Sequence, residues 1–297
     1  MSGSIKDRVA DFLGFADDET VRAIIPPWGG ELAIQLLHHI DFDALSARAN
    51  ASGRWPWLLG YSDTSTLMFA LTLRAGLATA HGPMLMELVP GQDDDVTAKW
   101  RDVLAMEPGA TLMQSSSNKW QRTGDDWNDS PTVPFELDQP TRWRGMKNAQ
   151  TVPGARFEGR LIGGCLDTLV HLVGTPFGDL AEYAARVARI NPRERVVLFL
   201  ETSGMSPVMF CRAMWQLRLA GWFDHVSGIV LGRHGAPDDP DYTFEEVLRE
   251  TTSGVDVPLI FDADVGHRPP QLTLVNGARA IVTLHAGGAA TLAQTLA

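Results

Sequence analysis

A serine on a turn between a predicted strand and a predicted helix is the strongest candidate for chemistry in this sequence. The segment LLGYSDTSTL places Ser62 directly after the strand 57–60, and a helix begins right after the turn. Such a strand–turn–helix element lifts a serine hydroxyl above a sheet edge, where N–H groups of the helix N-terminus can stabilise an oxyanion. The same pattern also suits Ser62 or Asp63 as a helix cap. The segment alone therefore leaves nucleophile and cap open.

Two further candidates stand at or after the ends of predicted strands. Glu201 ends the apolar strand RVVLFLE, and His267 lies in the loop FDADVGHRPPQLTL, which follows another strand. The carboxyl ends of strands are where sites form in open α/β sheets. Each of the two candidates could also be an ordinary loop residue, Glu201 in solvent and His267 bonded to backbone.

The sequence gives little sign of a metal or a nucleotide cofactor. Asp262, Asp264 and His267 form a D-x-D-x-x-H cluster of possible ligands, but no HExxH or CxxC pattern accompanies it. The glycine pairs at 29–30 and 163–164 lack Walker or Rossmann spacing. We therefore expect no metal and no cofactor.

The elements that must position these residues alternate between short apolar strands and amphipathic helices, which predicts an α/β fold. Helices are expected over 4–16, from Glu31 after the turn 28–30, after Ser62, over 93–106, and from Pro207 with Ser206 as cap and Val208, Cys211, Trp215 and Leu219 on one face. Strands are expected over 21–26, 57–60, 195–201, 227–233, 257–263, 272–277 and 279–285, with a turn and helix over 159–174.

We expect two α/β domains with the active site at their interface. Residues 1–112 would form an open sheet that carries the nucleophile elbow, and residues 154–297 a mostly β/α domain that carries Glu201 and His267. The stretch 113–153 is polar and contains prolines, which predicts a substrate loop or linker. It holds three tryptophans, Trp120, Trp127 and Trp143.

Composition narrows the classes of partner. Of 297 residues, 44% are hydrophobic and 21% charged, which suffices for a sizeable core, and the net charge of −11 disfavours nucleic acid and anionic membranes. The two cysteines, Cys165 and Cys211, are expected to be buried thiols. The start lacks a signal-peptide pattern, and no apolar run approaches the ~18 residues of a membrane span. We therefore expect a cytoplasmic protein.

Several segments, taken in order, resemble the LD-carboxypeptidase family of serine peptidases, and most of all its branch of microcin C self-immunity peptidases. They are IIPPWGGELA, DFDAL, LLGYSDTSTL, GLATAHGPML, FEGRLIGGCLDTL, VVLFLET, SGIVLGRH and GHRPPQLTLVNG. The resemblance implies a Ser-His-Glu triad of Ser62 in GYSD, His267 in GHRPP and Glu201 in LFLET. It also implies an oxyanion hole made by the amides of Asp63 and Gly30, with Gly29 beside the substrate.

The same resemblance implies the class of substrate. In the immunity branch a long loop holds the nucleotide part of an aminoacyl-nucleotide antibiotic, so Trp120 and Trp127 could stack on a base; equally, they could anchor the loop or a dimer contact. We expect Cys165 near the substrate, where the family commonly has Asn. After Glu201 the stretch ETSGMSP lacks the basic residue of that branch. A homodimer is also implied.

The expected function is hydrolysis of an amide in a peptidyl- or aminoacyl-nucleotide of the microcin C type, which would confer self-immunity. One alternative is an LD-carboxypeptidase that trims murein tetrapeptides. Another is an inactive, truncated relative that acts as a binding protein, because the family opens with a strand–helix–strand unit before the SIKDR-like helix at which this sequence starts.

Overall fold

Two β-sheets organise the computed structural model, which describes residues 3–88, 94–122 and 134–296. The smaller sheet has the order β1-β2-β3-β13, with β1, β2 and β3 parallel and β13 antiparallel to β3. Its strands are β1 (Ala23–Ile24), β2 (Trp57–Gly60), β3 (Thr79–His81) and β13 (Leu274–Asn276). A strand from the C-terminal part of the chain therefore completes the sheet that carries Ser62.

The larger sheet has nine strands in the order β4-β15-β14-β9-β10-β11-β12-β7-β8. Its four central strands are parallel, namely β9 (Ala155–Cys165), β10 (Val196–Glu201), β11 (Val226–Gly232) and β12 (Leu259–Ala263). Antiparallel strands flank them: β4 (Thr111–Ser115), β14 (Arg279–Leu284) and β15 (Ala290–Thr295) on one side, β7 (Arg144–Lys147) and β8 (Gln150–Val152) on the other. A separate short ladder joins β5 (Lys119–Trp120) to β6 (Gln139–Pro140).

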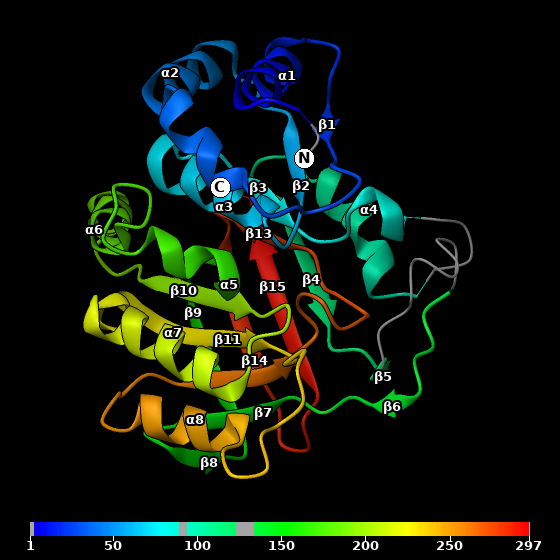
Figure 1. Ribbon diagram of the computed structural model, residues 1–297, viewed down its shortest axis with the longest axis vertical. Helices are drawn as coiled ribbons and strands as arrows, with labels where there is room; N and C mark the ends of the chain where they lie inside the picture. The colour runs from blue at the N-terminus through cyan, green and yellow to red at the C-terminus, as the bar shows by residue number, and fades with distance from the viewer. Residues whose placement is uncertain (1–2, 89–93, 123–133, 297) are drawn as a thin grey trace.

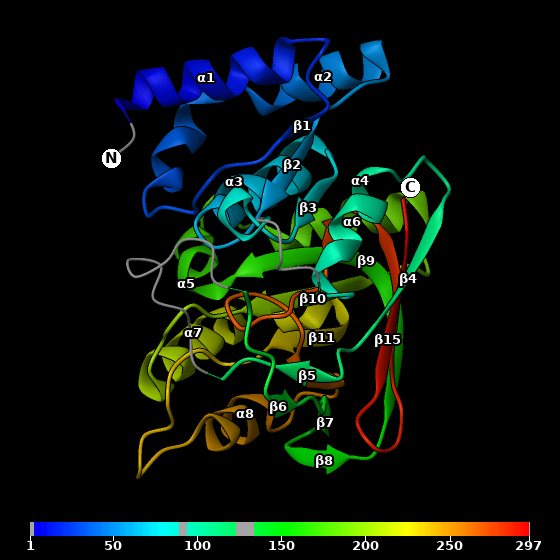
Figure 2. The same cartoon turned by 90° about the vertical axis from the view of Figure 1, so that its right-hand side faces the viewer.

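Helices pack on both sheets. Figure 1 shows α1 and α2 at the end of the molecule that holds the smaller sheet, and α7 and α8 side by side over the larger one; Figure 2 shows the same arrangement from the side. The α-helices are α1 (Ile5–Asp17), α2 (Phe42–Ser52), α3 (Thr64–Ala70, continued by a π-helical turn Leu71–Ala75), α4 (Trp100–Leu104), α5 (Leu166–Leu169), α6 (Leu180–Ile190), α7 (Pro207–Leu219) and α8 (Phe244–Thr252). Short 3-10 helices span Ala33–His39, Leu85–Glu87, Thr97–Lys99, Val170–Leu172 and Trp222–His225. None of the helices in the described ranges is long and apolar enough to cross a membrane.

The predicted α/β fold is confirmed in its main elements. Helix α1 and strands β2 and β10 form where the pattern placed them, and Ser206 Oγ caps α7 by accepting from the Met209 backbone N–H. Every residue of β10 is buried, as expected for a strand that is flanked by two parallel neighbours and covered on both faces. The helix expected from Glu31 forms as the 3-10 helix Ala33–His39.

Two predictions about local structure are wrong in part. The helix expected within 159–174 forms as α5 and the 3-10 helix Val170–Leu172, but residues 159–165, expected to be a turn, belong to the long strand β9. The glycines of β9 made its sequence look unlike a strand. A Cβ at Gly159 would overlap the backbone just before β10, and a Cβ at Gly163 would overlap the backbone of Phe199, so only glycine permits these close approaches. The face of α7 that carries Val208 and Leu219 is largely exposed, at 46% and 80%, so the apolar face assigned from the pattern is not the one that packs inward.

The segment 113–153, expected to be a loop or linker, forms several strands, and one strand of the expected C-terminal domain lies in the smaller sheet. The segment contributes β5 and β6 and most of β4, and it adds β7 and β8 to the far edge of the larger sheet. Conversely, β13 leaves the C-terminal part and joins the smaller sheet. The loop from β12 to β13, which contains His267, therefore runs from one sheet to the other and lies at their junction.

Candidate active site

Ser62 occupies a strained turn between β2 and α3. Its φ is 57°, a value that non-glycine residues rarely adopt and that costs of order 1–3 kcal/mol. Asp63 stands at the N-cap position of α3, but its side chain makes no capping bond and instead accepts from the Ala33 backbone N–H at 2.7 Å. The serine therefore departs from the conformation of a simple cap, and such strain is typical of functional sites.

The glycine pair expected at the oxyanion hole packs against this turn. A Cβ at Gly29 would lie 2.7 Å from Ser62 Cβ and 3.3 Å from the Asp63 backbone nitrogen, so only glycine fits there. Gly30 has φ +92°, and its nearest neighbour beyond the turn is the Asp63 carboxylate. Burial raises the pKa of Asp63, although its bond from Ala33 acts in the opposite sense. The structure thus brings both predicted oxyanion segments to Ser62.

Glu201 and His267 form a hydrogen-bonded pair at the junction of the sheets. His267 Nδ1 and Glu201 Oε2 are 2.6 Å apart, and the Glu201 side chain has no exposed surface. Burial alone would raise the pKa of Glu201 and lower that of His267, but their mutual attraction lowers the first and raises the second overall. Gly266 has φ +89°, and any Cβ there would overlap the Glu201 carboxylate, so the chain passes this point only as glycine.

Ser62 and His267 line the same cavity, of about 200 Å³. No hydrogen bond between their side chains is present among the described residues, which is common before a substrate is bound. The walls are mostly apolar, and the cavity is lined by Pro27, Trp28, Gly29, Tyr61, Ser62, Met84, Met86, Glu87, Gln121, Phe135, His267 and Pro269. A serine hydroxyl and a histidine held by a carboxylate thus open onto one largely apolar space, an arrangement that suits acyl transfer.

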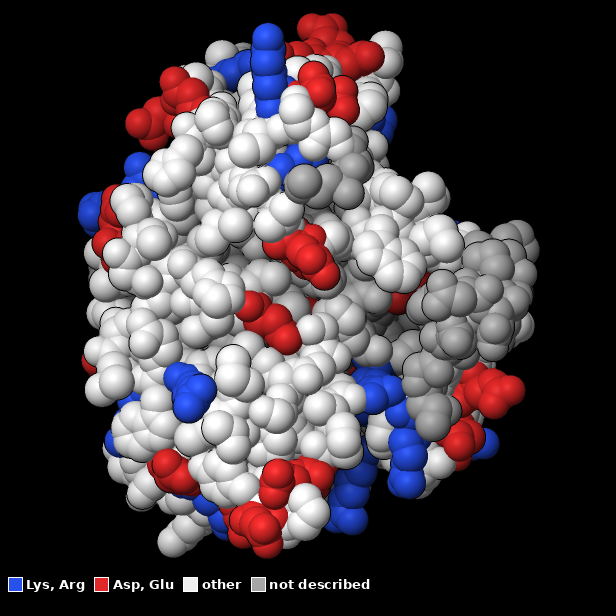
Figure 3. Space-filling model, viewed as in Figure 1, with Lys and Arg blue, Asp and Glu red and all other residues white. Residues whose placement is uncertain are grey.

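Of the predicted substrate residues that the structure describes, Gly29 lines this cavity, whereas Trp120 and Cys165 do not. Trp120 lines a neighbouring cavity of about 680 Å³, where Arg233 lies 5.3 Å from the centre of its ring. Figure 3 shows basic side chains gathered at the lower right of this face, and the cavity is lined by Arg122, Arg142, Arg144 and Arg233. Trp127 lies outside the described residues.

Cys165 ends β9 beside Glu201 rather than in the cavity. Its side chain is 1% exposed, and in the parallel register it is the partner of Glu201. Burial, followed by the negative charge of Glu201, raises the pKa of its thiol well above the ordinary value. Cys165 is therefore placed to affect Glu201, and its predicted contact with substrate stays a prediction.

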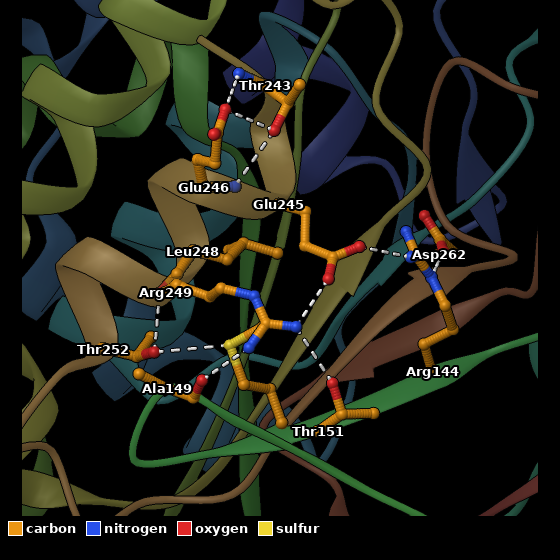
Figure 4. A network of polar contacts seen from close by, with 11 residues as sticks. Arg144, Ala149, Thr151, Thr243, Glu245, Glu246, Leu248, Arg249, Thr252 and Asp262 are labelled. Atoms are coloured by element: carbon orange, nitrogen blue, oxygen red, sulfur yellow. Dashed lines mark hydrogen bonds and ion pairs between the residues drawn. The ribbon is translucent and has the colours of Figure 1, made fainter.

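The D-x-D-x-x-H residues do not converge on one point. Asp264 is fully buried and accepts from Arg233 and from Trp143 Nε1, at 2.8 Å for the latter. Asp262 instead pairs with Arg144 at 2.6 Å in the network of Figure 4. Within the described ranges the group whose ligand atoms lie close enough for a metal is Cys165, Glu201 and His267.

For two residues of the site no role was predicted. Tyr61 packs edge-on against the His267 imidazole with ring centres 4.7 Å apart, and its hydroxyl donates to Glu87 Oε1 at 2.9 Å. Glu87 is a buried carboxylate on the cavity wall. The available signal was a single glutamate inside the apolar run Met84–Leu88, which is hard to distinguish from a solvated loop residue without tertiary information.

Comparison with known proteins agrees with this geometry. Residues 1–82 match the LD-carboxypeptidase N-terminal domain, and residues 158–282 match the LD-carboxypeptidase C-terminal domain. The microcin C7 self-immunity protein MccF of Escherichia coli is 28% identical over 284 residues, which are 94% of this chain and 76% of that protein. The probable murein peptide carboxypeptidase of Bacillus subtilis is 26% identical over 94% of this chain and 74% of its own length.

Solved structures show the same relationship. MccF in complex with aspartyl sulfamoyl adenosine matches with a TM-score of 0.77 at 26% identity, covering 99% of this chain and 82% of that one. A muramoyltetrapeptide carboxypeptidase from Oxalobacter formigenes shares the fold, with a TM-score of 0.70 at 21% identity over 99% of this chain and 86% of that one. The chain belongs to the LD-carboxypeptidase family of peptidases, which implies a serine hydrolase.

Proposed function

We propose that this protein hydrolyses an amide bond in a peptidyl- or aminoacyl-nucleotide of the microcin C type, and so confers self-immunity. The observation that carries the proposal is the His267–Glu201 pair, at 2.6 Å, beside the cavity that Ser62 also lines. Support for the substrate class comes from MccF, whose solved complexes contain glutamyl sulfamoyl guanosine and aspartyl sulfamoyl adenosine.

The proposed mechanism assigns one role to each residue. His267 removes the proton of Ser62 as the serine oxygen attacks the amide carbonyl, and Glu201 holds the imidazole with its proton on Nδ1 and stabilises the imidazolium. The backbone amides of Asp63 and Gly30 bind the oxyanion, and one such donor typically contributes ~10²–10³ in rate. His267 then protonates the leaving nitrogen, and water hydrolyses the acyl-enzyme with His267 again as base.

A second candidate, trimming of murein tetrapeptides, is favoured by the position of Trp120. This tryptophan lines the neighbouring cavity rather than the one that Ser62 lines. If no base stacks on Trp120, the nucleotide part of the substrate lacks the stacking contact that was expected for the self-immunity function.

A homodimer is proposed as well, on the family resemblance, and analytical ultracentrifugation would test it.

The test is hydrolysis followed by mass spectrometry, with an aminoacyl-sulfamoyl adenosine and a murein tetrapeptide as separate substrates. Wild type, Ser62→Ala and Trp120→Ala are compared. Cleavage of the adenosine compound alone, lost in Ser62→Ala and weakened in Trp120→Ala, is the expected result. Cleavage of the tetrapeptide alone, with Trp120→Ala unaffected, would replace the proposal by the murein function. Equal cleavage by wild type and Ser62→Ala would refute the role of Ser62 in both.

A further inference from the structure

Glu87 is a carboxylate in the catalytic cavity that the proposed mechanism leaves without a task. It ends the 3-10 helix Leu85–Glu87 and is 7% exposed. Glu201 already orients His267, so the triad needs no second acidic residue. Among the described residues that line the cavity there is no lysine or arginine. Figure 3 shows acidic side chains at the centre of this face of the molecule.

Among the residues that the structure describes, the donors that reach Glu87 are all neutral. Oε1 accepts from the Tyr61 hydroxyl and Oε2 from the Met84 backbone N–H, each at 2.9 Å, and Gln271 Nε2 lies 3.4 Å from both oxygens. The charges that act on the group are those of His267 and Glu201, which belong to the triad. Burial raises the pKa of Glu87 to about 7. An ionised carboxylate is costly to bury without a positive partner, and the described residues of the cavity wall offer none besides the imidazole.

The surroundings of Glu87 suit one kind of missing partner. A carboxylate accepts hydrogen bonds through up to four lone-pair positions; Tyr61 and Met84 use one on each oxygen of Glu87, and the others meet only the long 3.4 Å contacts of Gln271. An ammonium group supplies three donors together with the positive charge that these neutral donors lack. The wall includes Trp28 and Phe135, and aromatic rings attract cations that pass over their faces. Ser62 opens onto the same cavity, so a group held at Glu87 belongs to the part of the substrate near the scissile carbonyl.

We propose that Glu87 binds the ammonium group of the residue whose carbonyl Ser62 attacks, and so selects substrates that carry a free amine next to the scissile bond. This inference rests on the proposed amide hydrolysis at Ser62 and names its substrate class more closely. It makes Glu87 a specificity residue: the carboxylate takes no part in proton transfer, and it holds the aminoacyl group so that the carbonyl faces the serine.

The rival explanation is that Glu87 only anchors the Tyr61 ring against His267. Tyr61→Phe separates the two, because it removes the hydroxyl that bonds to Glu87 but keeps the ring that packs on the imidazole. If anchoring is the whole role, neither Tyr61→Phe nor Glu87→Gln should change the preference between substrates, whatever each does to the rate. If Glu87 binds an amine, Glu87→Gln alone should change the preference between substrates.

The experiment uses an aminoacyl-sulfamoyl adenosine and its analogue with hydrogen in place of the α-amine. Binding of both compounds is measured by calorimetry in a Ser62→Ala background, with and without Glu87→Gln or Tyr61→Phe, and turnover is measured with Ser62 intact. We expect Glu87→Gln to lower the preference for the amine by about 10–100-fold, the range of one hydrogen bond to a charged group. Tyr61→Phe should leave most of that preference.

A second readout is proton release. Near pH 6.5 part of Glu87 is protonated in the empty cavity, so binding of the ammonium compound should release protons, seen as a dependence of the heat on the buffer. The Gln variant should lose this release. An unchanged preference in Glu87→Gln, an equal loss in Tyr61→Phe, or no binding of either compound would overturn the inference. Amine-dependent binding without turnover would instead refute the proposed hydrolysis and leave the amine site standing.

Discussion

Replacing Glu201 by glutamine removes one charge from the centre of the proposed triad and keeps the size of the side chain. The carboxylate is fully buried and contacts His267 Nδ1 at 2.6 Å. It therefore favours the tautomer with the proton on Nδ1, which leaves Nε2 free to accept a proton from Ser62. A glutamine amide can instead donate to Nδ1 and favour the wrong tautomer, and it carries no charge to stabilise the imidazolium.

The expected loss follows from these two effects. In a serine triad, converting the carboxylate to its amide costs about 10⁴-fold in turnover, as measured in another protease family. We therefore expect Glu201→Gln to lower kcat by roughly 10³–10⁴-fold, which is about 4–5.5 kcal/mol at 1.36 kcal/mol for each tenfold step. The pH profile should also move. Glu201 raises the pKa of His267, and the base acts when neutral, so the rise of kcat with pH should occur at lower pH in the variant.

The assay is the pH dependence of kcat for the cleaved substrate, together with urea unfolding to verify the fold. Glu194→Gln is a matched control, because Glu194 is also buried and paired, with Arg160 at 3.1 Å, but it precedes β10 at the opposite end from Glu201. The control should lose stability without losing kcat. A folded Glu201→Gln protein that keeps wild-type kcat and an unmoved pH profile would refute the assignment of Glu201 to the triad.

Two further predictions use groups around the site. In Gly266→Ala the new Cβ would overlap the Glu201 carboxylate at a backbone φ of +89°, so the His267–Glu201 pair should be displaced and kcat should fall by about 100-fold or more; wild-type kinetics would contradict the crowding inferred here. Burial lowers the pKa of His81 to about 4. As pH drops from 6.5 to 4, the unfolded chain therefore binds a proton at His81 that the folded chain does not, and the free energy of unfolding falls by up to roughly 3 kcal/mol. Folded Glu87, with its pKa raised to about 7, instead holds a proton that the unfolded chain has released, so its contribution falls as pH rises from 4.5 to 7. The two effects oppose each other, and Glu87→Gln should lose more unfolding free energy than wild type between pH 6.5 and 4.5 in urea titrations. Parallel pH profiles of the two proteins would show that burial does not raise the pKa of Glu87 in the folded protein.

Some features of this protein were determined by local sequence. The turn after β2 was identified because an apolar strand, a glycine, a serine and a helix start follow one another within a few residues. Strand β10 was identified because its run of apolar residues, which ends at Glu201, suits a strand buried on both faces. Helix α7 was identified by Ser206 and Pro207, which fit the cap and the first turn. In each case the signal lies within about ten neighbouring residues.

Other features were decided only by the tertiary structure. Strand β9 was missed because its glycines, unfavourable in isolated strands, are required by the closeness of β10. Glu201 and His267 are 66 positions apart in sequence, and they meet because parallel strands bring their carboxyl ends to one edge of a sheet. Glu87 acquires its burial, its raised pKa and its place beside Ser62 largely from residues remote in sequence, among them Tyr61, Gln271 and other parts of the cavity wall. The sequence by itself determined which residue types could do chemistry and on which local elements they lie. The pairing of distant strands determined which of these residues share a cavity, because the contacts that stabilise this pairing are made between residues that no local pattern contains.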